Sequence, residues 1–346
     1  MVSTSARAGL MPGAVLLGTL ALAAPAFAME GGSQVVGSQS SETCVNPAPS
    51  HASLSGMVVG FSQSENEQNP FRAAETQSVK DAAAAAGVKR LLYTNAADSQ
   101  AKQVADMQSM IAQGAQAIIV APLNATGLQP ALEQAAAKGV PVVTIDRETA
   151  GTPCQPVITF LGSDFRAQGV RAAQALAEAT GGKAKVMEIQ GAYGNSVETQ
   201  RTEGFADGLK AHPDMHLVAA QTGNWSATDA QRVTDQVLLA HPDVDALYAQ
   251  ADVMALGAMT AITQSGRQPG KEIRIVSIDG TKAFVQDIAS GQAQADVETN
   301  PRFGPLSFQA LADWFAGKPV ARTTTMKDAL YTSANSADAL KSGTPY

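Results

Sequence analysis

Short apolar runs alternate with longer stretches of helical period along most of the chain after residue 56. The runs have the length and continuity of strands buried on both faces, and they lie at residues 57–61, 117–121, 141–145, 185–189, 246–249 and 273–278. Between them, Ala- and Gln-rich stretches carry apolar residues at helical spacing, at residues 72–86, 102–113, 127–138, 166–179 and 228–240. Repeated strand, helix and strand units of this kind predict an α/β fold with parallel sheets and helices on both faces.

The alternation runs through two similar halves, at about residues 56–160 and 163–298, and each half is long enough to form a sheet of its own. In parallel sheets covered by helices on both faces, ligands bind beyond the carboxyl ends of the strands. Two facing lobes would direct two sets of strand ends into one cleft. The residues that directly follow each predicted strand are therefore the first candidates for function.

Charged side chains follow strands in both halves. Asp146 and Arg147 come directly after the strand at 141–145, Asp279 follows a strand of the second half, and Arg201 lies on a helix that begins after another strand-end loop. A carboxylate accepts hydrogen bonds and a guanidinium donates several, so these residue types suit a polyol with neighbouring hydroxyl groups. A local ion pair on the surface would explain Asp146 and Arg147 equally well.

Two aromatic residues, Phe71 and Trp225, are candidates for contact with the apolar face of a sugar ring. Phe71 belongs to the segment Asn69-Pro70-Phe71-Arg72, which leads from the first predicted strand into a helix. For each aromatic residue, ordinary packing in the core is the alternative.

The first 28 residues have the features of a secretory signal peptide. One positive charge, Arg7, precedes an apolar run over residues 9–24, and the stretch ends in Ala26-Phe27-Ala28, the pattern of small residues that signal peptidase cuts. A transmembrane anchor is the alternative, but the run is shorter than the roughly 20 apolar residues that a spanning helix needs. We therefore expect cleavage after Ala28 and, in a Gram-negative cell, a periplasmic protein.

Residues 29–55 are rich in Gly, Ser, Pro and Asn without a hydrophobic period, and they predict a flexible leader. The two cysteines of the chain are Cys44, inside this leader, and Cys154. Cys44 lies too far beyond the apolar run to be the lipid-modified cysteine of a lipoprotein. An even pair in an oxidising compartment favours a disulfide, which would join the leader to the first lobe, and two unpaired thiols are the alternative.

Charge and motifs argue against several classes of function. The formal net charge of −7 disfavours nucleic acid and anionic membrane surfaces as partners. The chain lacks the glycine-rich nucleotide-binding motifs, the H-E-x-x-H zinc motif and the G-x-S-x-G nucleophile motif. His212 and His216 flank Pro213, which breaks a helical pairing, so we expect no metal site. We also expect no cofactor and no enzymatic activity.

Short motifs along the chain point to one family. In order, they include Gly60-Phe61-Ser62-Gln63, Phe71-Arg72-Ala73-Ala74-Glu75-Thr76, Ala121-Pro122, Asp146-Arg147, Gln190-Gly191, Gly204-Phe205-Ala206, Ser277-Ile278-Asp279-Gly280 and Ala329-Leu330-Tyr331. Together they resemble the periplasmic sugar-binding proteins related to ribose-binding protein, and most closely their galactofuranose-binding branch. The resemblance covers nearly everything after residue 56. It implies a type I periplasmic binding protein, with two doubly wound parallel-sheet lobes joined by three hinge crossings.

By this resemblance, the chain crosses between the lobes near residues 162–163, 298–300 and 327–328. The crossings would divide it into a signal peptide at 1–28, a flexible leader at 29–55, an N-terminal lobe at 56–162 plus 300–327, and a C-terminal lobe at 163–299 plus 328–346.

The resemblance also implies which residues contact the ligand. Positions that match the contacts of the family are Asn69, Phe71, Asp146, Arg147, Arg201, Trp225, Asp279 and Thr299, and Arg72 matches a further contact of the galactofuranose-like branch. Two positions are instructive because they lack an amide. Ala121 stands where ribose binders carry Asn, as in the galactofuranose-like branch, whereas Ala251 stands where both groups carry Asn. Without that amide, the ligand of this chain can differ from both sugars.

The resemblance implies a periplasmic substrate-binding protein that captures a monosaccharide, galactofuranose-like or another pentose or hexose, by closing its lobes. Its partners would be the permease subunits of an ABC importer. A sensor that presents sugar to a chemoreceptor is the alternative, and the sequence does not separate the two. The effector domain of a transcription regulator shares this fold, but a signal peptide occupies the place of its DNA-binding helices. A monomer is expected.

Overall fold

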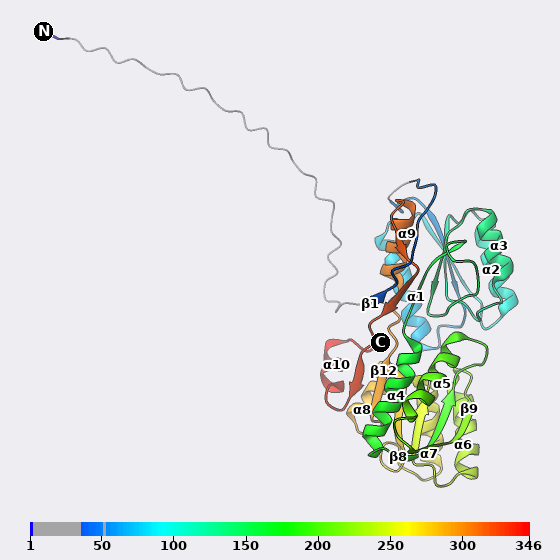
Figure 1. The fold of residues 1–346 in the computed structure, drawn as a ribbon, viewed down its shortest axis with the longest axis vertical. Coiled ribbons are helices and arrows are strands. Elements are labelled where there is room, and N and C mark those ends of the chain that lie inside the picture. Colours follow the sequence, from blue (N-terminus) through cyan, green and yellow to red (C-terminus); the bar gives the residue numbers. More distant parts are fainter. Residues whose placement is uncertain (3–35, 51–52) are drawn as a thin grey trace. The chain divides into compact units, whose positions relative to one another are not determined.

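Two large β-sheets with helices packed on both faces and one small two-stranded sheet lie in the described part of the chain, which comprises residues 1–2, 36–50 and 53–346 of a computed structural model (Figure 1). Both sheets belong to one compact unit, Gln34–Tyr346. The predicted cleavage site after Ala28 lies outside the described residues. Within the described ranges, no helix is long and apolar enough to cross a membrane.

The first sheet is built mainly from the first half of the chain. Among the described residues it has seven strands, and all neighbours are parallel except the edge strand β1 and its partner β14. In spatial order they are β1 (Val36–Gln39), β14 (Thr323–Met326), β7 (Val157–Gly162), β6 (Val142–Ile145), β5 (Ala117–Val120), β3 (Val58–Gln63) and β4 (Arg90–Asn95).

Helices cover both faces of this sheet, and its central strand β5 is apolar at every position. Alternate residues of a strand point to opposite faces. In β5, Ile119 packs with α1 (Pro70–Ala85) and α9 (Gly304–Phe315), whereas Ile118 and Val120 pack with α2 (Gln100–Ala112) and α3 (Gln129–Ala137). The continuous apolar run of β5 is thereby buried on both sides, as its sequence predicts.

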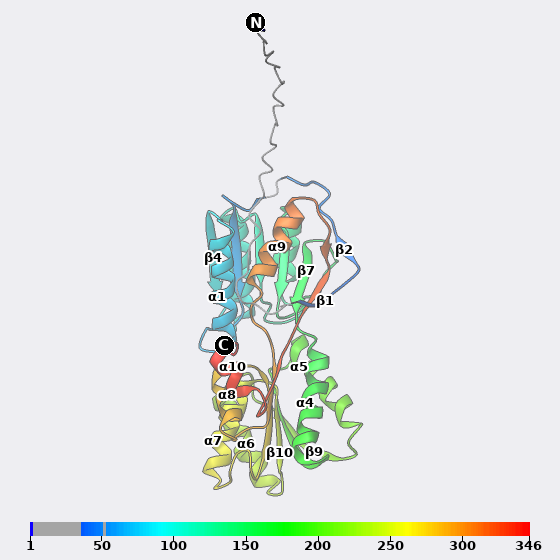
Figure 2. The ribbon, with the colours of Figure 1, turned by 90° about the vertical axis from the view of Figure 1, so that its left-hand side faces the viewer.

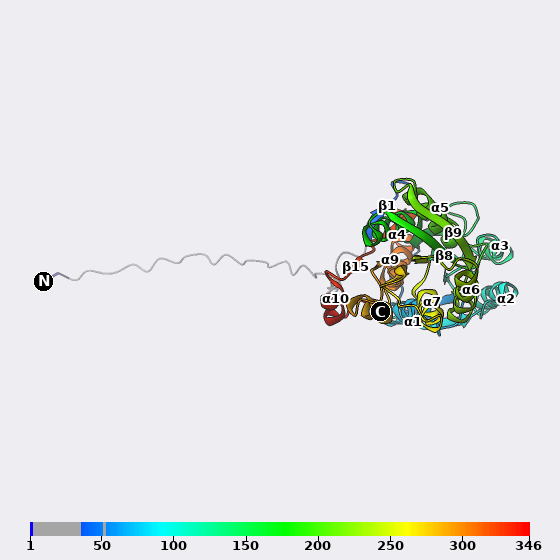
Figure 3. The ribbon, with the colours of Figure 1, turned by 90° about the horizontal axis from the view of Figure 1, so that it is seen from below.

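The second sheet has six strands in the described part of the chain, and its edge strand β15 runs antiparallel to β12. In spatial order they are β15 (Leu330–Thr332), β12 (Ala295–Glu298), β11 (Arg274–Asp279), β10 (Ala246–Ala249), β8 (Lys183–Gln190) and β9 (Asp214–Thr222). On one face lie α4 (Phe165–Thr180) and α5 (Ser196–Leu209); on the other lie α6 (Ala227–Ala240), α7 (Asp252–Gln264) and α8 (Lys282–Ala289), and a short helix, α10 (Ser336–Ser342), follows β15 (Figure 3).

The predicted α/β fold with two parallel sheets is confirmed. The chain passes from the first sheet to the second between β7 and α4, returns between β12 and α9, and passes again between β14 and β15 (Figure 2). These passages place the carboxyl ends of the strands of both sheets toward one cleft. The exact lobe boundaries stay a prediction.

The segment after residue 35 differs from the flexible leader that we expected. Residues 36–39 form β1, which pairs with β14, and β2 (Thr43–Cys44) pairs with β13 (Val320–Ala321). The segment is fixed by backbone hydrogen bonds to edge strands and needs no hydrophobic period of its own, so its composition did not reveal the pairing. The predicted disulfide between Cys44 and Cys154 is confirmed, and it joins β2 to the loop before β7.

Candidate functional site

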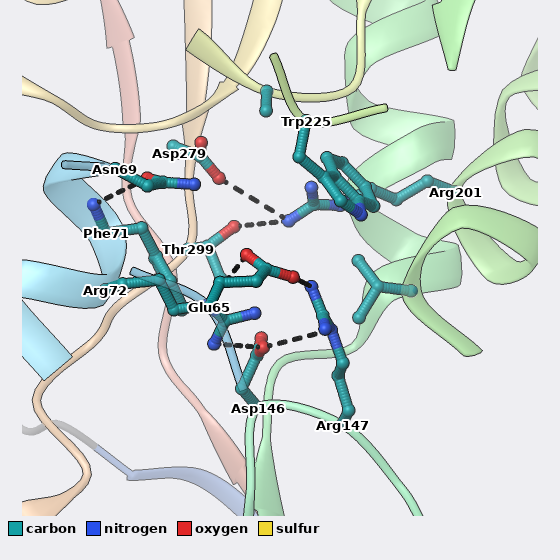
Figure 4. Close-up of a pocket in the computed structure, with 12 residues that line it drawn as sticks. Glu65, Asn69, Phe71, Arg72, Asp146, Arg147, Arg201, Trp225, Asp279 and Thr299 are labelled. Carbon is teal, nitrogen blue, oxygen red and sulfur yellow. Dashed lines mark hydrogen bonds and ion pairs between the residues drawn. The ribbon is translucent and has the colours of Figure 1, made fainter. Parts of the chain in front are cut away.

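A small pocket lies between the carboxyl ends of the two sheets (Figure 4). About 330 Å³ of space, part of it open to solvent, lies between its walls. All nine residues predicted for the site line this pocket, as does Ala251, and two residues that we did not predict join them. The full lining is Glu65, Asn69, Phe71, Arg72, Asp146, Arg147, Val197, Arg201, Trp225, Ala251, Asp279 and Thr299.

Ionic contacts fix the charged side chains on the first-sheet wall of the pocket. Arg72 donates to Glu75 at 2.9 Å and to Glu65 at 3.1 Å, and it forms an ion pair with Asp146 at 2.7 Å. Arg147 reaches the other oxygen of Glu65 at 2.5 Å, so the Glu65 carboxylate bridges two guanidiniums. Both arginines are thereby held in one orientation, with their remaining donors available to a ligand.

Burial decides between the two interpretations of Asp146 and Arg147. The two residues are only 4% and 3% exposed, so they do not form a surface ion pair. Asp146 directly follows β6 with a φ of 62°, in the left-handed region that aspartate tolerates better than most residues, and here the chain turns at the pocket. Arg147 and Asp146 lie 3.5 Å apart. Asp146 has a shorter contact with Arg72, and Arg147 has a shorter contact with Glu65.

The electrostatics of this wall favour an ionised Glu65. Burial alone would raise the pKa of Glu65, but the charges and hydrogen bonds of Arg147 and Arg72 together lower it from 4.5 to about 2. Glu75 lies behind Arg72 and is fully enclosed. Burial raises the pKa of Glu75 to about 7, with a further contribution from the charge of Asp146 against the opposing effect of Arg72.

Arg201 fixes the opposite wall. From α5, its Nε donates to Gln168 at 3.0 Å, its Nη1 donates to the carbonyl of Gln250, and its Nη2 donates to Thr299 at 2.7 Å. The carboxylate of Asp279 lies 3.8 Å from the same Nη2. One guanidinium thus joins residues from α4, α5, the end of β11 and the segment after β12. These contacts give this wall its shape before any ligand binds.

Glycines in two helices bring Arg201 within reach of its partner on α4. A Cβ atom at Gly204 would lie 2.0 Å from the carbonyl oxygen of Arg166, and one at Gly169 would lie 2.3 Å from that of Arg201. Only glycine permits this close approach of α4 and α5. The Gly204-Phe205-Ala206 motif therefore serves the site through helix packing.

The two predicted aromatic residues lie at the pocket in different ways. Phe71 packs in the core of the first lobe and also lines the pocket, so its contact with a sugar ring stays a prediction. Asn69 caps α1 by accepting from the Phe71 amide at 3.0 Å, which leaves its amide NH₂ for a ligand. Trp225 rests directly on Gly191, where a Cβ atom would meet the indole at 1.9 Å.

Ala251 lies at the N-cap position of α7, where Asn or Ser would usually cap the helix, and its side chain makes no capping bond. An oxygen of the Asp279 carboxyl group instead accepts from the Asp252 amide at 3.3 Å, so this group occupies the start of the helix. Burial, and then the neighbouring Asp252, raise the pKa of Asp279 well above its ordinary value, although Arg201 opposes them. Asp279 thus contacts both the Asp252 amide of α7 and the Arg201 guanidinium of α5.

Glu65 and Val197 were missing from the sequence-based set. Glu65 lies two residues beyond β3, so the rule that strand ends carry the site would have included it. Val197 lies in the first turn of α5, which begins at the loop after β8, and a single valine there gives no chemical signal. Within the described residues, no cluster of acidic, His or Cys side chains could hold a metal ion.

Comparisons with known proteins agree with this architecture. Residues 59–319 match the family described as periplasmic binding protein domain. The galactofuranose-binding protein YtfQ of Escherichia coli is 32% identical over 295 residues, which cover 84% of this chain and 92% of that protein.

Two solved structures are similar to this chain at a TM-score of 0.79 each. The binding protein of the arabinose ABC transporter from Shewanella sp. ANA-3, bound to α- and β-L-arabinofuranose, is 32% identical, with 82% of this chain and 95% of that chain covered. A Mycobacterium smegmatis protein in complex with β-D-fucofuranose is 33% identical, with 83% and 94% covered. On the family match and these likenesses, the chain belongs to the periplasmic binding proteins of the sugar-binding kind.

Proposed function

We propose that this protein binds one uncharged monosaccharide in the pocket between its two sheets and delivers it to the permease subunits of an ABC importer. The observation that carries the proposal is a pocket whose walls come from both sheets and whose charged groups are already paired. Similar proteins include a galactofuranose-binding protein and two whose structures hold arabinofuranose or fucofuranose, so a furanose form of the sugar is the first choice.

The balance of charge in the pocket supports an uncharged ligand. Three acidic and three basic side chains line it in the described structure, and each guanidinium has a carboxylate within 4 Å. A ligand carboxylate would compete with Glu65, Asp146 or Asp279 for these cations, and buried like charges repel strongly. Sugar hydroxyls both donate and accept, so they suit carboxylates and guanidiniums that stay paired with one another.

A thermal-shift screen tests the proposal. D-Galactose, D-fucose, L-arabinose and D-ribose are compared with D-galacturonate, which resembles galactose but carries a carboxylate. A sugar that binds only the folded protein stabilises it by about 2.7 kcal/mol at a hundredfold excess over its Kd. At least one neutral sugar should raise the melting temperature, and D-galacturonate should not. If no neutral sugar did so, or if galacturonate gave the largest shift, the proposal would be wrong.

Three finer points belong to this proposal. The family implies a periplasmic location, and we propose export with cleavage after Ala28. We propose that the protein is a binding protein without catalytic activity and that it works as a monomer. Presentation of the sugar to a chemoreceptor stays the alternative to import.

A further inference from the structure

The last residues of the chain run back from α10 to the cleft. Gly343 ends α10 with a φ of 73°, in the left-handed region, and the chain then turns toward the end of β11. The Tyr346 amide donates to the Gly280 carbonyl at 3.3 Å, and the Tyr346 carbonyl accepts from the Lys282 amide at 2.6 Å. In Figures 1 and 2 this end of the chain lies beside α1 and α8, at the level where the two sheets face each other.

The Tyr346 hydroxyl supports two residues of the pocket from behind. It donates to the Asp279 carbonyl at 3.0 Å, and the same carbonyl accepts from the Thr299 amide at 2.8 Å. The side chains of Asp279 and Thr299 both line the pocket and both lie next to Arg201. Burial, and then the charge of Asp279, raise the pKa of Tyr346 well above 10, so the hydroxyl stays protonated and keeps donating at neutral pH.

The Tyr346 ring contacts the opposite lobe. Its centroid lies 6.2 Å from that of Phe71 at an interplanar angle of 67°, an edge-to-face arrangement that aromatic pairs favour. Phe71 lies on α1 of the first lobe, lines the pocket, and has the Arg72 guanidinium 5.0 Å from its ring. The hydroxyl contact is made within the second lobe, whereas the ring contact joins the two lobes.

We propose that Tyr346 is a positioning residue of the ligand site and an interlobe latch. Its hydroxyl holds the end of β11 in the position that presents Asp279, and its ring contacts Phe71 only while the lobes are close together. The ring contact therefore stabilises the closed arrangement selectively, which is the condition for slowing the release of an enclosed ligand. This inference rests on the proposed function, because release is measured with a sugar.

The test separates the two contacts by substitution. Tyr346→Phe removes the hydroxyl and keeps the ring, whereas Tyr346→Leu removes both. Tyr93→Phe is the matched control, since Tyr93 is a partly buried tyrosine of β4 whose hydroxyl bonds to Glu67 away from the pocket. Binding of D-galactose and L-arabinose is measured by calorimetry and by stopped-flow fluorescence, which give Kd and the association and dissociation rates.

Tyr346→Phe should raise Kd by about fivefold through the lost hydrogen bond. Tyr346→Leu should raise Kd by about a further threefold through the lost aromatic pair. This further increase should come from faster dissociation, while the association rate stays within twofold of that of the parent. The control should bind like the parent. Dissociation rates within twofold of the parent in both Tyr346 variants would overturn the inference.

A second measurement keeps the latch testable without any sugar. If the parent bound no sugar of the screen, the proposed function would fail, but the contact could still be judged from urea unfolding of Phe71→Leu, Tyr346→Leu and the double variant. If the latch stabilises the closed arrangement, part of the sugar-free protein is closed, and the two residues should then give non-additive midpoint shifts. Additive shifts would show that the ring contact is not populated, and the latch would be wrong.

Discussion

Glu65 provides the sharpest test of the charged wall, because one carboxylate bridges Arg72 and Arg147 in a nearly solvent-free position. We expect Glu65→Gln to destabilise the folded protein and to weaken sugar binding. An amide offers one acceptor where the carboxylate offers two, and its NH₂ group would face a guanidinium. The two arginines would then lose their common partner.

The magnitude follows from the pKa. A pKa lowered from 4.5 to about 2 corresponds to about 3 kcal/mol of folding free energy, since one pKa unit equals about 1.4 kcal/mol. Because the folded pKa is depressed, this stability is present above pH 4.5 and is lost as the pH falls through 2. Removing one partner of a buried ion pair typically costs about 3 to 5 kcal/mol, which is the same range.

Urea unfolding at several pH values between 7 and 3 measures the effect. The difference in unfolding free energy between the parent and Glu65→Gln should be about 3 kcal/mol at pH 7 and should shrink as the pH falls below 4.5. Glu67→Gln is the control, because Glu67 is 40% exposed and its contact with Lys80 is 3.7 Å long. A Glu65→Gln difference that equals the control, or that does not change with pH, would refute the reasoning.

Three further predictions follow from the same structure. Arg147→Ala and Asp279→Ala should each abolish sugar binding detectable by calorimetry, because each lost hydrogen bond to a charged group costs about 1.5 to 3 kcal/mol. The far-ultraviolet circular dichroism spectrum should stay that of the parent, and a Kd within threefold of the parent would contradict the prediction. Reducing the disulfide, which closes a separation of 110 residues, should lower the unfolding free energy by up to about 4 to 5 kcal/mol in urea titrations, and an unchanged midpoint would count against it. Ala251→Asn should stabilise the ligand-free protein by about 1 kcal/mol, because the new side chain can cap α7. The same change should weaken binding of the best sugar in calorimetry. Tighter binding would show instead that the ligand carries a hydroxyl at this position.

The strands of the interior were predictable from the sequence, but edge strands were not. Every residue of β5 is apolar and β6 departs from this only at Thr144, because both faces of these strands are covered. Strands β4 and β9 lie at the edges of their sheets, where most side chains are half-buried or exposed, so neither forms a continuous apolar run. Strand β1 is recognisable only through its pairing with β14, which lies almost 300 residues later in the chain.

The site residues that directly follow strands, or that match the ligand contacts of the family, were predictable from the sequence. Asp146, Arg147 and Asp279 directly follow apolar strands, and the structure brings them to one pocket. Glu65 was missed because its neighbours in the polar segment include Glu67, which has the same chemistry. The burial of one and the exposure of the other depend on Arg147, 82 residues away in the chain. Contacts at that separation are set by the fold, so the position of Glu65 after β3 makes it a candidate but does not separate it from Glu67.

A crystal structure of the protein with the sugar that gives the largest thermal shift tests the central claim most directly. The account predicts one sugar in the pocket between the two sheets, with its oxygen atoms within hydrogen-bond distance of Arg147 from the first lobe and of Asp279 from the second. A sugar bound outside this pocket, or in contact with only one lobe, would contradict it.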